Sequence, residues 1–137
     1  MRDRVFMDTN VLIYAYSDTE PEKKEKSLII LEQEDVMIST QVINEFIWNM
    51  YNKFQIDIEA LNDLTDRLFN RFKVSLIDKN TISRALDLVQ QLKYSYWDSL
   101  IIASALIHDC SSLYTEDMQH DQIIENKLRI FNPFMGM

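Results

Sequence analysis

The sequence is poor in the residues that several common functional sites require. Glycine occurs once, as Gly136, and cysteine once, as Cys110. A phosphate-binding loop or a dinucleotide-binding turn needs glycines so that backbone N–H groups can approach phosphate closely, and both kinds of site are therefore excluded. One cysteine cannot form an internal disulfide, and with only two histidines a zinc site of thiolate and imidazole ligands is not expected. Any metal ion in this protein would be bound by oxygen.

The chain also lacks a long apolar segment. No stretch approaches the ~20 apolar residues of a transmembrane helix, and the N-terminal residues contain no apolar core of a signal peptide. We therefore expect a cytoplasmic protein without a membrane partner. Since 47% of the 137 residues are hydrophobic, we expect a single domain that spans residues 1–137 and has its own core.

Basic residues are outnumbered by acidic ones, and the formal net charge is −8. Proteins that coat nucleic acid rely on Lys and Arg to displace counterions from phosphates, so this composition argues against a broad nucleic-acid-binding surface. Any contact with nucleic acid would have to be local.

Short apolar runs alternate with amphipathic segments along the chain. Strands are expected at residues 5–7, 35–40, 73–77, 111–115 and 128–134, and helices within residues 9–16, 21–34, 42–54, 57–72, 80–92 and 97–108. The last of these helices is apolar nearly all round and should be buried. Short strands joined by helices favour an α/β fold of three layers, α/β/α, with a central parallel sheet of four to five strands.

Two of the helices have apolar positions that predict a buried face. In residues 21–34, Leu28, Ile29 and Leu31 are expected to point inward. In residues 80–92 the expected buried residues share one helical face, and they are Ile82, Ala85, Leu86, Val89 and Leu92.

Four acidic residues follow predicted strands or begin the helices after them: Asp8, Glu45, Asp98 and Asp117. In open parallel α/β sheets, ligands bind beyond the carboxyl ends of the strands, where the strand order reverses. Carboxylates that gather there repel one another unless a cation neutralises them. Mg²⁺ or Mn²⁺ prefers oxygen ligands and can activate a water molecule for attack on phosphorus, so the predicted chemistry is phosphodiester hydrolysis.

Each acid also has a structural interpretation. Asp8 could cap the helix that follows it, Asp98 is favoured near a helix N-terminus by the helix dipole, and Asp117 could belong to an ordinary turn. Glu45 is harder to explain in this way, because it lies among apolar residues, where a carboxylate without a partner is costly. The functional interpretation depends on the four acids taken together.

With these positions, the chain resembles the PIN domain family, and within it the VapC-type ribonuclease toxins of toxin–antitoxin pairs. The matching stretches are "FMDTNVLIYA", "ISTQVINEF", "YSYWDSLIIASA", "LYTEDMQH" and "NPF". The resemblance implies a PIN fold and an endoribonuclease that depends on Mg²⁺ or Mn²⁺. It also implies an RNA substrate, a cognate VapB-like antitoxin and a homodimer.

The resemblance assigns the family's acidic quartet to Asp8, Glu45, Asp98 and Asp117, with Asp8 and Asp98 as the direct metal ligands. The polar residues Thr9, Asn10 and Thr115 match positions beside these acids, although each could also serve only to close a turn. Asp121 departs from the pattern, because many relatives have glycine there. It places a fifth acid near the site, at a position where a turn favours positive φ.

Other residues are less clearly functional. His120 could position phosphate but could also be a surface residue, whereas the helix dipole explains His108 and packing explains Cys110. The aromatic residues Trp48, Tyr51, Phe54 and Trp97 could form a partner surface or belong to the core. The basic side chains are expected to be solvated on polar faces, and they are Lys23, Lys24, Lys26, Arg67, Arg71 and Lys73.

Two alternatives to a ribonuclease remain. A phosphatase of the haloacid dehalogenase type also has an aspartate after its first strand, but it needs a second acid two residues later, where this chain has Asn10. A non-catalytic PIN-like module that binds RNA or protein would be expected to lack part of the quartet. All four acids are present here, although their presence does not prove turnover.

Overall fold

A six-stranded sheet runs through the centre of the molecule. The computed structural model describes residues 3–32 and 35–137. The strands are β1 (Val5–Met7), β2 (Val36–Ser39), β3 (Lys73–Ser75), β4 (Ser112–Tyr114), β5 (Ile123–Ile124) and β6 (Leu128–Phe131), and their order across the sheet is β3-β2-β1-β4-β6-β5. All neighbouring strands are parallel except β5 and β6, which pair antiparallel.

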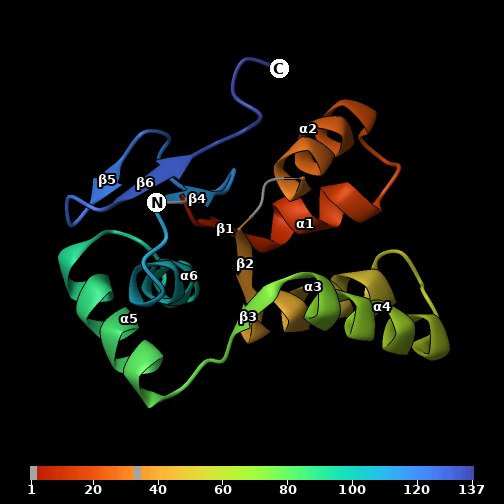
Figure 1. Cartoon of the computed structure of the whole chain (residues 1–137), viewed down its shortest axis with the longest axis horizontal. Coiled ribbons are helices and arrows are strands. Elements are labelled where there is room, and N and C mark those ends of the chain that lie inside the picture. The colour runs from red at the N-terminus through yellow and green to blue at the C-terminus, as the bar shows by residue number, and fades with distance from the viewer. Residues whose placement is uncertain (1–2, 33–34) are drawn as a thin grey trace.

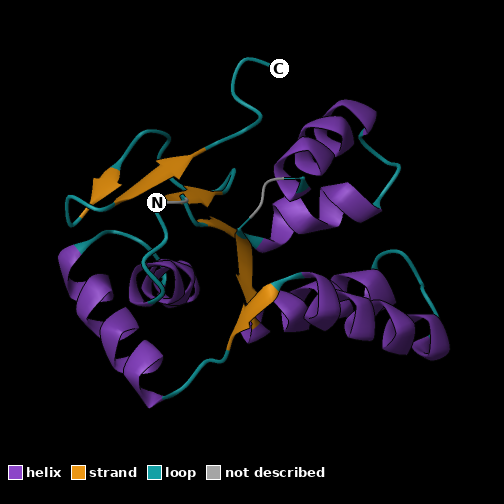
Figure 2. Ribbon diagram, in the orientation of Figure 1, coloured by secondary structure: helices purple, strands orange, loops and turns teal. Residues whose placement is uncertain are grey.

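Six helices connect the parallel strands, and they cover both faces of the sheet (Figures 1 and 2). Helices α1 (Thr9–Tyr16), α2 (Pro21–Leu31), α3 (Thr40–Asn52) and α4 (Ile58–Arg71) lie on one side, and α5 (Lys79–Gln91) and α6 (Tyr96–Ile107) lie on the other (Figure 1). The expected three-layer α/β/α fold is confirmed.

The core lies between the sheet and these helices. Fully buried side chains from the sheet include Phe6, Leu113 and Ile130, and they meet apolar residues of the surrounding helices such as Phe46 and Ile102. Helix α6 is buried along most of its length, as its uniformly apolar sequence predicts. The rigid core fixes the strand ends from which the candidate site is built.

The sheet has one strand more than the sequence predicts. Strand β5 is only two residues long and joins β6 through a turn in which Glu125 and Asn126 both have positive φ. Turns of this kind usually contain glycine, and this one has none, so the hairpin gave no signal in the sequence.

The predicted inward faces of two helices are partly wrong. On α2, Leu31 is buried as predicted, but Leu28 and Ile29 are exposed and Ile30 is buried. On α5 the buried residues are Thr81, Ala85 and Leu88, whereas Ile82, Leu86 and Val89 are exposed and Leu92 is half-buried. The apolar residues of each helix are spread over a wider arc than the neighbouring elements cover, so periodicity alone does not decide which of them are buried.

Within the described ranges 3–32 and 35–137, none of the helices combines the length and the apolar character that crossing a membrane requires.

An ion pair between Arg4 and the buried Asp35 lies where β1 and β2 begin. Asp35 is 8% exposed, and its Oδ2 accepts a hydrogen bond of 3.1 Å from Nε of Arg4. We expect Arg4→Met to lower the free energy of unfolding by about 2–3 kcal/mol, because the substitution leaves Asp35 as a buried charge with weaker compensation. Chemical denaturation measures this difference.

The matched control is Lys24→Met, which removes the ion pair of Lys24 with the highly exposed Asp18. Exposed pairs contribute little, so this variant should lose less than about 1 kcal/mol. Equal losses in the two variants would contradict the special role of the Arg4–Asp35 pair.

Candidate active site

The strand order reverses at β1, which lies between β2 and β4. The chain moves outward from β1 through β2 to β3, and then returns to the other side of β1 to form β4. Such a switch point leaves a crevice at the carboxyl ends of the strands. Asp8 directly follows β1, and the segment from Thr115 to Asp117 directly follows β4.

Asp8 is held at the end of the central strand by three hydrogen bonds. Its backbone N–H donates to the Tyr114 carbonyl at 2.9 Å, which continues the β1–β4 pairing. Its carboxylate Oδ1 accepts from the backbone N–H of Thr9 at 2.7 Å, and Oδ2 accepts from the Thr115 hydroxyl at 2.8 Å. Asp8 is therefore the N-cap of α1, as the structural interpretation proposes, while its side chain also lines the cavity described below.

The other three acids come from separate elements. Glu45 lies on α3, and its Oε1 accepts a hydrogen bond of 2.7 Å from the Thr9 hydroxyl. Asp98 lies in the first turn of α6, where Ser95 caps the helix by accepting from the Asp98 backbone N–H at 3.1 Å. Asp117 follows β4, and its Oδ2 accepts from the Asn10 side-chain amide at 2.8 Å.

All four acids line one cavity of about 380 Å³. The remaining lining residues are polar or aromatic, with one exception, Ile101, and they are Thr9, Asn10, Gln41, Asn44, Trp48, Asn49 and Trp97. Among the residues that the structure describes, no lysine, arginine or histidine lines this cavity. The sequence prediction that four distant acids meet at one edge of the sheet thus agrees with their placement.

The pKa values of three of these acids are raised. Burial raises the pKa of Asp8 from 3.8 to about 7; hydrogen bonds from Thr115 and Thr9 oppose this effect, and the charges of Asp117 and Glu45 add to it. Burial and the charges of Asp117 and Glu45 raise the pKa of Asp98, and burial and the charge of Glu116 raise that of Asp117. Burial, with repulsion between acids as a smaller effect, therefore makes the ionised site unfavourable without a cation.

The donor set fits a divalent metal ion in its chemistry. Four carboxylates, with hydroxyl and amide oxygens beside them, are the ligands that Mg²⁺ and Mn²⁺ prefer. In the described part of the chain, however, no three His, Cys, Asp or Glu side chains converge closely enough to hold one ion together. Glu45, Asp117 and Asp8 are engaged instead with Thr9, Asn10 and Thr115, so binding an ion requires some of the acidic side chains to turn toward one another.

The residues predicted to support the quartet have clear positions. Thr9, Asn10 and Thr115 each donate a side-chain hydrogen bond to one acid, namely Glu45, Asp117 and Asp8 in that order. Asp121 does not line the cavity; it forms an ion pair with Arg129. Its φ is +69°, so the expected positive φ at this turn is confirmed.

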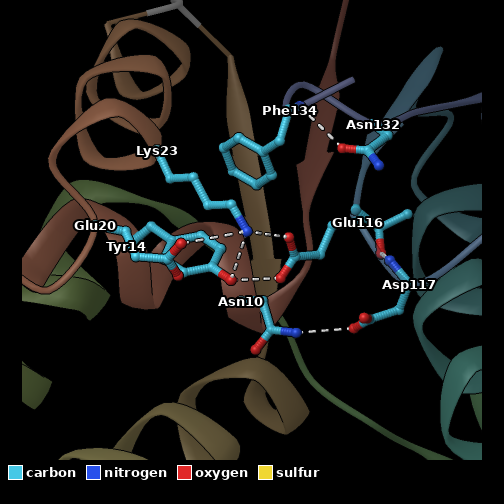
Figure 3. Close-up of polar contacts among 9 residues, drawn as sticks. Asn10, Tyr14, Glu20, Lys23, Glu116, Asp117, Asn132 and Phe134 are labelled. Atoms are coloured by element: carbon cyan, nitrogen blue, oxygen red, sulfur yellow. Dashed lines mark hydrogen bonds and ion pairs between the residues drawn. The ribbon is translucent and has the colours of Figure 1, made fainter. Parts of the chain in front are cut away.

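Glu116 and Asp117 are adjacent but point in different directions (Figure 3). Glu116 faces Lys23, whose Nζ lies 3.0 Å from Oε2, and it also accepts a hydrogen bond from the Tyr14 hydroxyl. Asp117 faces Asn10. The aromatic ring of Phe134 packs edge-on against that of Tyr14 at 5.2 Å and lies near the Lys23 ammonium.

This contact network has no signal in the sequence. The expectation that Lys23 lies on a solvated face is wrong, because Lys23 pairs with Glu116, which is distant in the sequence. The sequence also leaves open whether Trp48 and Trp97 belong to the core, and both are largely exposed at the cavity. The helical spacing could have placed Trp48 on the same face as Glu45, because Gln41, Glu45 and Trp48 follow one another at intervals of four and three residues along α3.

His120 and His108 lie away from the cavity. His120 Nδ1 accepts a hydrogen bond from the Asn132 backbone N–H at 3.0 Å, and His108 Nε2 lies 2.9 Å from the Ser75 hydroxyl. Cys110 is fully buried in the core. None of these three side chains lines the acidic cavity.

Comparison with known families identifies the fold. The model of the PIN domain family matches residues 5–125, a span that includes all four acids. The chain belongs to the PIN domain family. A comparison with curated protein sequences finds no match to this PIN domain.

Several solved structures are similar to this PIN domain. A toxin–antitoxin complex from Klebsiella pneumoniae has 21% sequence identity and a TM-score of 0.70, with 95% of this chain and 98% of that chain covered. FitAcB from Neisseria gonorrhoeae has 17% identity and a TM-score of 0.67, with 96% and 99% covered. VapC20 from Mycobacterium tuberculosis, described as a sarcin-ricin loop cleaving toxin, has 18% identity and a TM-score of 0.65, with 82% and 91% covered. At these identities the similarity establishes the fold.

The raised pKa of Asp8 predicts how stability depends on pH in the absence of metal. Between the unfolded value of 3.8 and the folded value of about 7, the folded protein retains a proton that the unfolded chain has lost. Stability should therefore fall as the pH rises through this range. In EDTA, we expect a higher melting temperature near pH 5 than near pH 8.

The variant Asp8→Asn keeps the shape of the side chain without its charge. At about pH 8 in EDTA it should be more stable than the unmodified protein by at least about 1 kcal/mol, and its melting temperature should vary less with pH. Thermal unfolding followed by circular dichroism tests both points. A variant less stable than the unmodified protein at this pH would contradict the burial of an ionised carboxylate.

Proposed function

We propose that this PIN domain is a metal-dependent endoribonuclease and that it acts as the toxin of a toxin–antitoxin pair. The observation that carries the proposal is the cavity lined by Asp8, Glu45, Asp98 and Asp117 without any basic residue among the described residues. Such a site requires a cation to be stable when it is ionised. A divalent ion bound by the carboxylates would polarise a phosphodiester and lower the pKa of an attacking water molecule.

The protein's own residues have distinct parts in this proposal. Asp8 and Asp98 would hold the ion directly, because Asp8 is fixed at the end of β1 and Asp98 in the first turn of α6. Burial raises the pKa of each, and acidic neighbours add to this effect, so a cation would stabilise the ionised form of both. Glu45 and Asp117 would complete the ligand set or accept protons from bound water. Thr9 and Thr115 orient Glu45 and Asp8 through the hydrogen bonds described above. Hydrolysis breaks one P–O bond and leaves one phosphate and one hydroxyl end.

One further point supports a toxin. Structural neighbours include toxins and toxin–antitoxin complexes, such as VapC20 and the Klebsiella pneumoniae complex. We propose that an antitoxin of the VapB type binds this chain, and a homodimer stays a prediction from the family resemblance.

Cleavage of RNA by the purified protein tests the proposal. With Mn²⁺ or Mg²⁺ we expect cleavage, and EDTA should abolish it. Asp8→Asn and Asp98→Asn should each lower the rate by at least about 100-fold, because each removes a charged metal ligand. The control Asp87→Asn alters an exposed acid on α5 and should retain full activity.

A thermal-shift measurement separates metal binding from turnover. Mn²⁺ should raise the melting temperature of the unmodified protein and of Asp87→Asn, and raise that of Asp8→Asn much less. Cleavage that persists in EDTA, or full activity in both site variants, would contradict the mechanism. Metal binding without cleavage of any RNA would favour a non-catalytic PIN module that binds RNA or protein.

A further inference from the structure

We propose that the neutral wall of the acidic cavity binds one unpaired nucleotide, whose base stacks on the indoles of Trp48 and Trp97. The inference rests on the ribonuclease activity proposed above, and it adds how the protein holds RNA beside the acids. With a net charge of −8, this protein lacks a broad basic surface for binding RNA. Stacking on the two indoles would provide another source of affinity.

The two tryptophans are exposed to an unusual degree for such large side chains. Trp48 is 68% exposed on α3 and Trp97 is 62% exposed on α6, and both line the cavity that the four acids line. The ring of Trp97 makes an edge contact with Tyr96, with 5.4 Å between ring centroids and an interplanar angle of 68°. Exposed indoles beside a polar site offer flat apolar surface that a ligand can cover.

A buried oxygen next to the tryptophans lacks a hydrogen-bond donor. Gln41 is 8% exposed and lines the cavity, and its Nε2 donates to the Trp97 carbonyl at 3.1 Å. Within the part of the chain that the structure describes, its Oε1 has no partner. A buried acceptor left in this state is costly, so a ligand in the cavity would stabilise Gln41 if its side-chain amide turned to accept a hydrogen bond from the ligand. Nucleotides carry hydrogen-bond donors on their bases and on the ribose 2′-hydroxyl.

The size and position of the cavity favour a nucleotide over a protein segment. Its volume of about 380 Å³ lies at the low end of the range typical of small-ligand sites, about 300–1,000 Å³. Each indole is close in sequence to a predicted metal ligand, since Trp97 precedes Asp98 and Trp48 lies one helical turn after Glu45. A nucleotide with its phosphate at the acids therefore has its base beside this wall.

Stacking suits an acidic protein because it needs no basic residue. Base–aromatic stacking is a main source of affinity in proteins that bind single strands, and it accepts every base because each has a π-face. Bases within a duplex have both faces covered by their neighbours. The proposed subsite is therefore specific for unpaired RNA such as a loop or a single strand.

Intrinsic fluorescence reports directly on the subsite, because Trp48 and Trp97 are the only tryptophans in the sequence. The Asp8→Asn protein with Mg²⁺ is titrated with a short unstructured oligoribonucleotide, which it should not cleave. We expect saturable quenching of the tryptophan emission by the single strand. The same sequence paired with its complement should produce little quenching at equal concentration.

Steady-state cleavage of that oligoribonucleotide by the metal-loaded enzyme provides the second readout. Trp48→Ala and Trp97→Ala should each raise KM by about 5-fold to 100-fold, and kcat should change less than KM. Trp48→Phe and Trp97→Phe keep an aromatic face and should raise KM much less. Phe69→Ala removes an exposed aromatic on α4 outside the cavity and should leave KM unchanged.

The outcomes distinguish this inference from the proposed function. If RNA is cleaved but both alanine variants keep the normal KM and the single strand causes no quenching, the subsite is wrong and the ribonuclease stands. If the single strand quenches the tryptophans but no RNA is cleaved, the ribonuclease is wrong and the subsite stands. Quenching by an antitoxin segment and not by RNA would assign this wall to a protein partner and overturn the inference.

Discussion

The carboxylate of Asp8 is a negative charge that the fold places almost out of water, at the end of the strand in the middle of the sheet. Its position follows from β1, whose apolar residues are buried between β2 and β4 and leave the backbone no freedom at this point. Thr9 and Thr115 donate hydrogen bonds to its two oxygens, but these contacts do not outweigh the burial that raises its pKa. Because this carboxylate cannot move into solvent, the neighbouring acids and any bound cation must adjust to it.

The loop after β4 contains Glu116 and Asp117, and its conformation determines where these two acids point. It turns Glu116 toward Lys23 and Tyr14, and it turns Asp117 toward Asn10 and the cavity (Figure 3). Lys23 is thus engaged by an acid outside the cavity, and none of the described residues that line the cavity is a cation. Through Glu116 the loop contacts Lys23 on α2 and Tyr14 on α1, and the ring of Phe134 packs against that of Tyr14.

Much of the fold and of the candidate site could be predicted from the sequence because both depend on local signals. Short apolar strands alternating with helices gave the three layers, and the acids that follow those strands meet at the switch point that the layers create. The signals failed where a property depends on distant contacts. Lys23 could not be paired with Glu116, and the exposure of Leu86 on α5 or of Trp97 on α6 could not be seen, since helical spacing does not tell which neighbour covers a face. Strand β5 was missed because it is short and its turn lacks glycine.

We propose that the four carboxylates form one metal site at the switch point, although Glu45, Asp117 and Asp8 accept hydrogen bonds from Thr9, Asn10 and Thr115. A crystal structure with Mn²⁺, in which the ion is located by its anomalous scattering, is the sharpest test of this site. We expect Mn²⁺ in the cavity with Asp8 and Asp98 among its ligands, and with Glu45 or Asp117 turned toward it. A cavity that stays free of Mn²⁺ at saturating concentration, or Mn²⁺ bound only elsewhere on the protein, would contradict the proposed site.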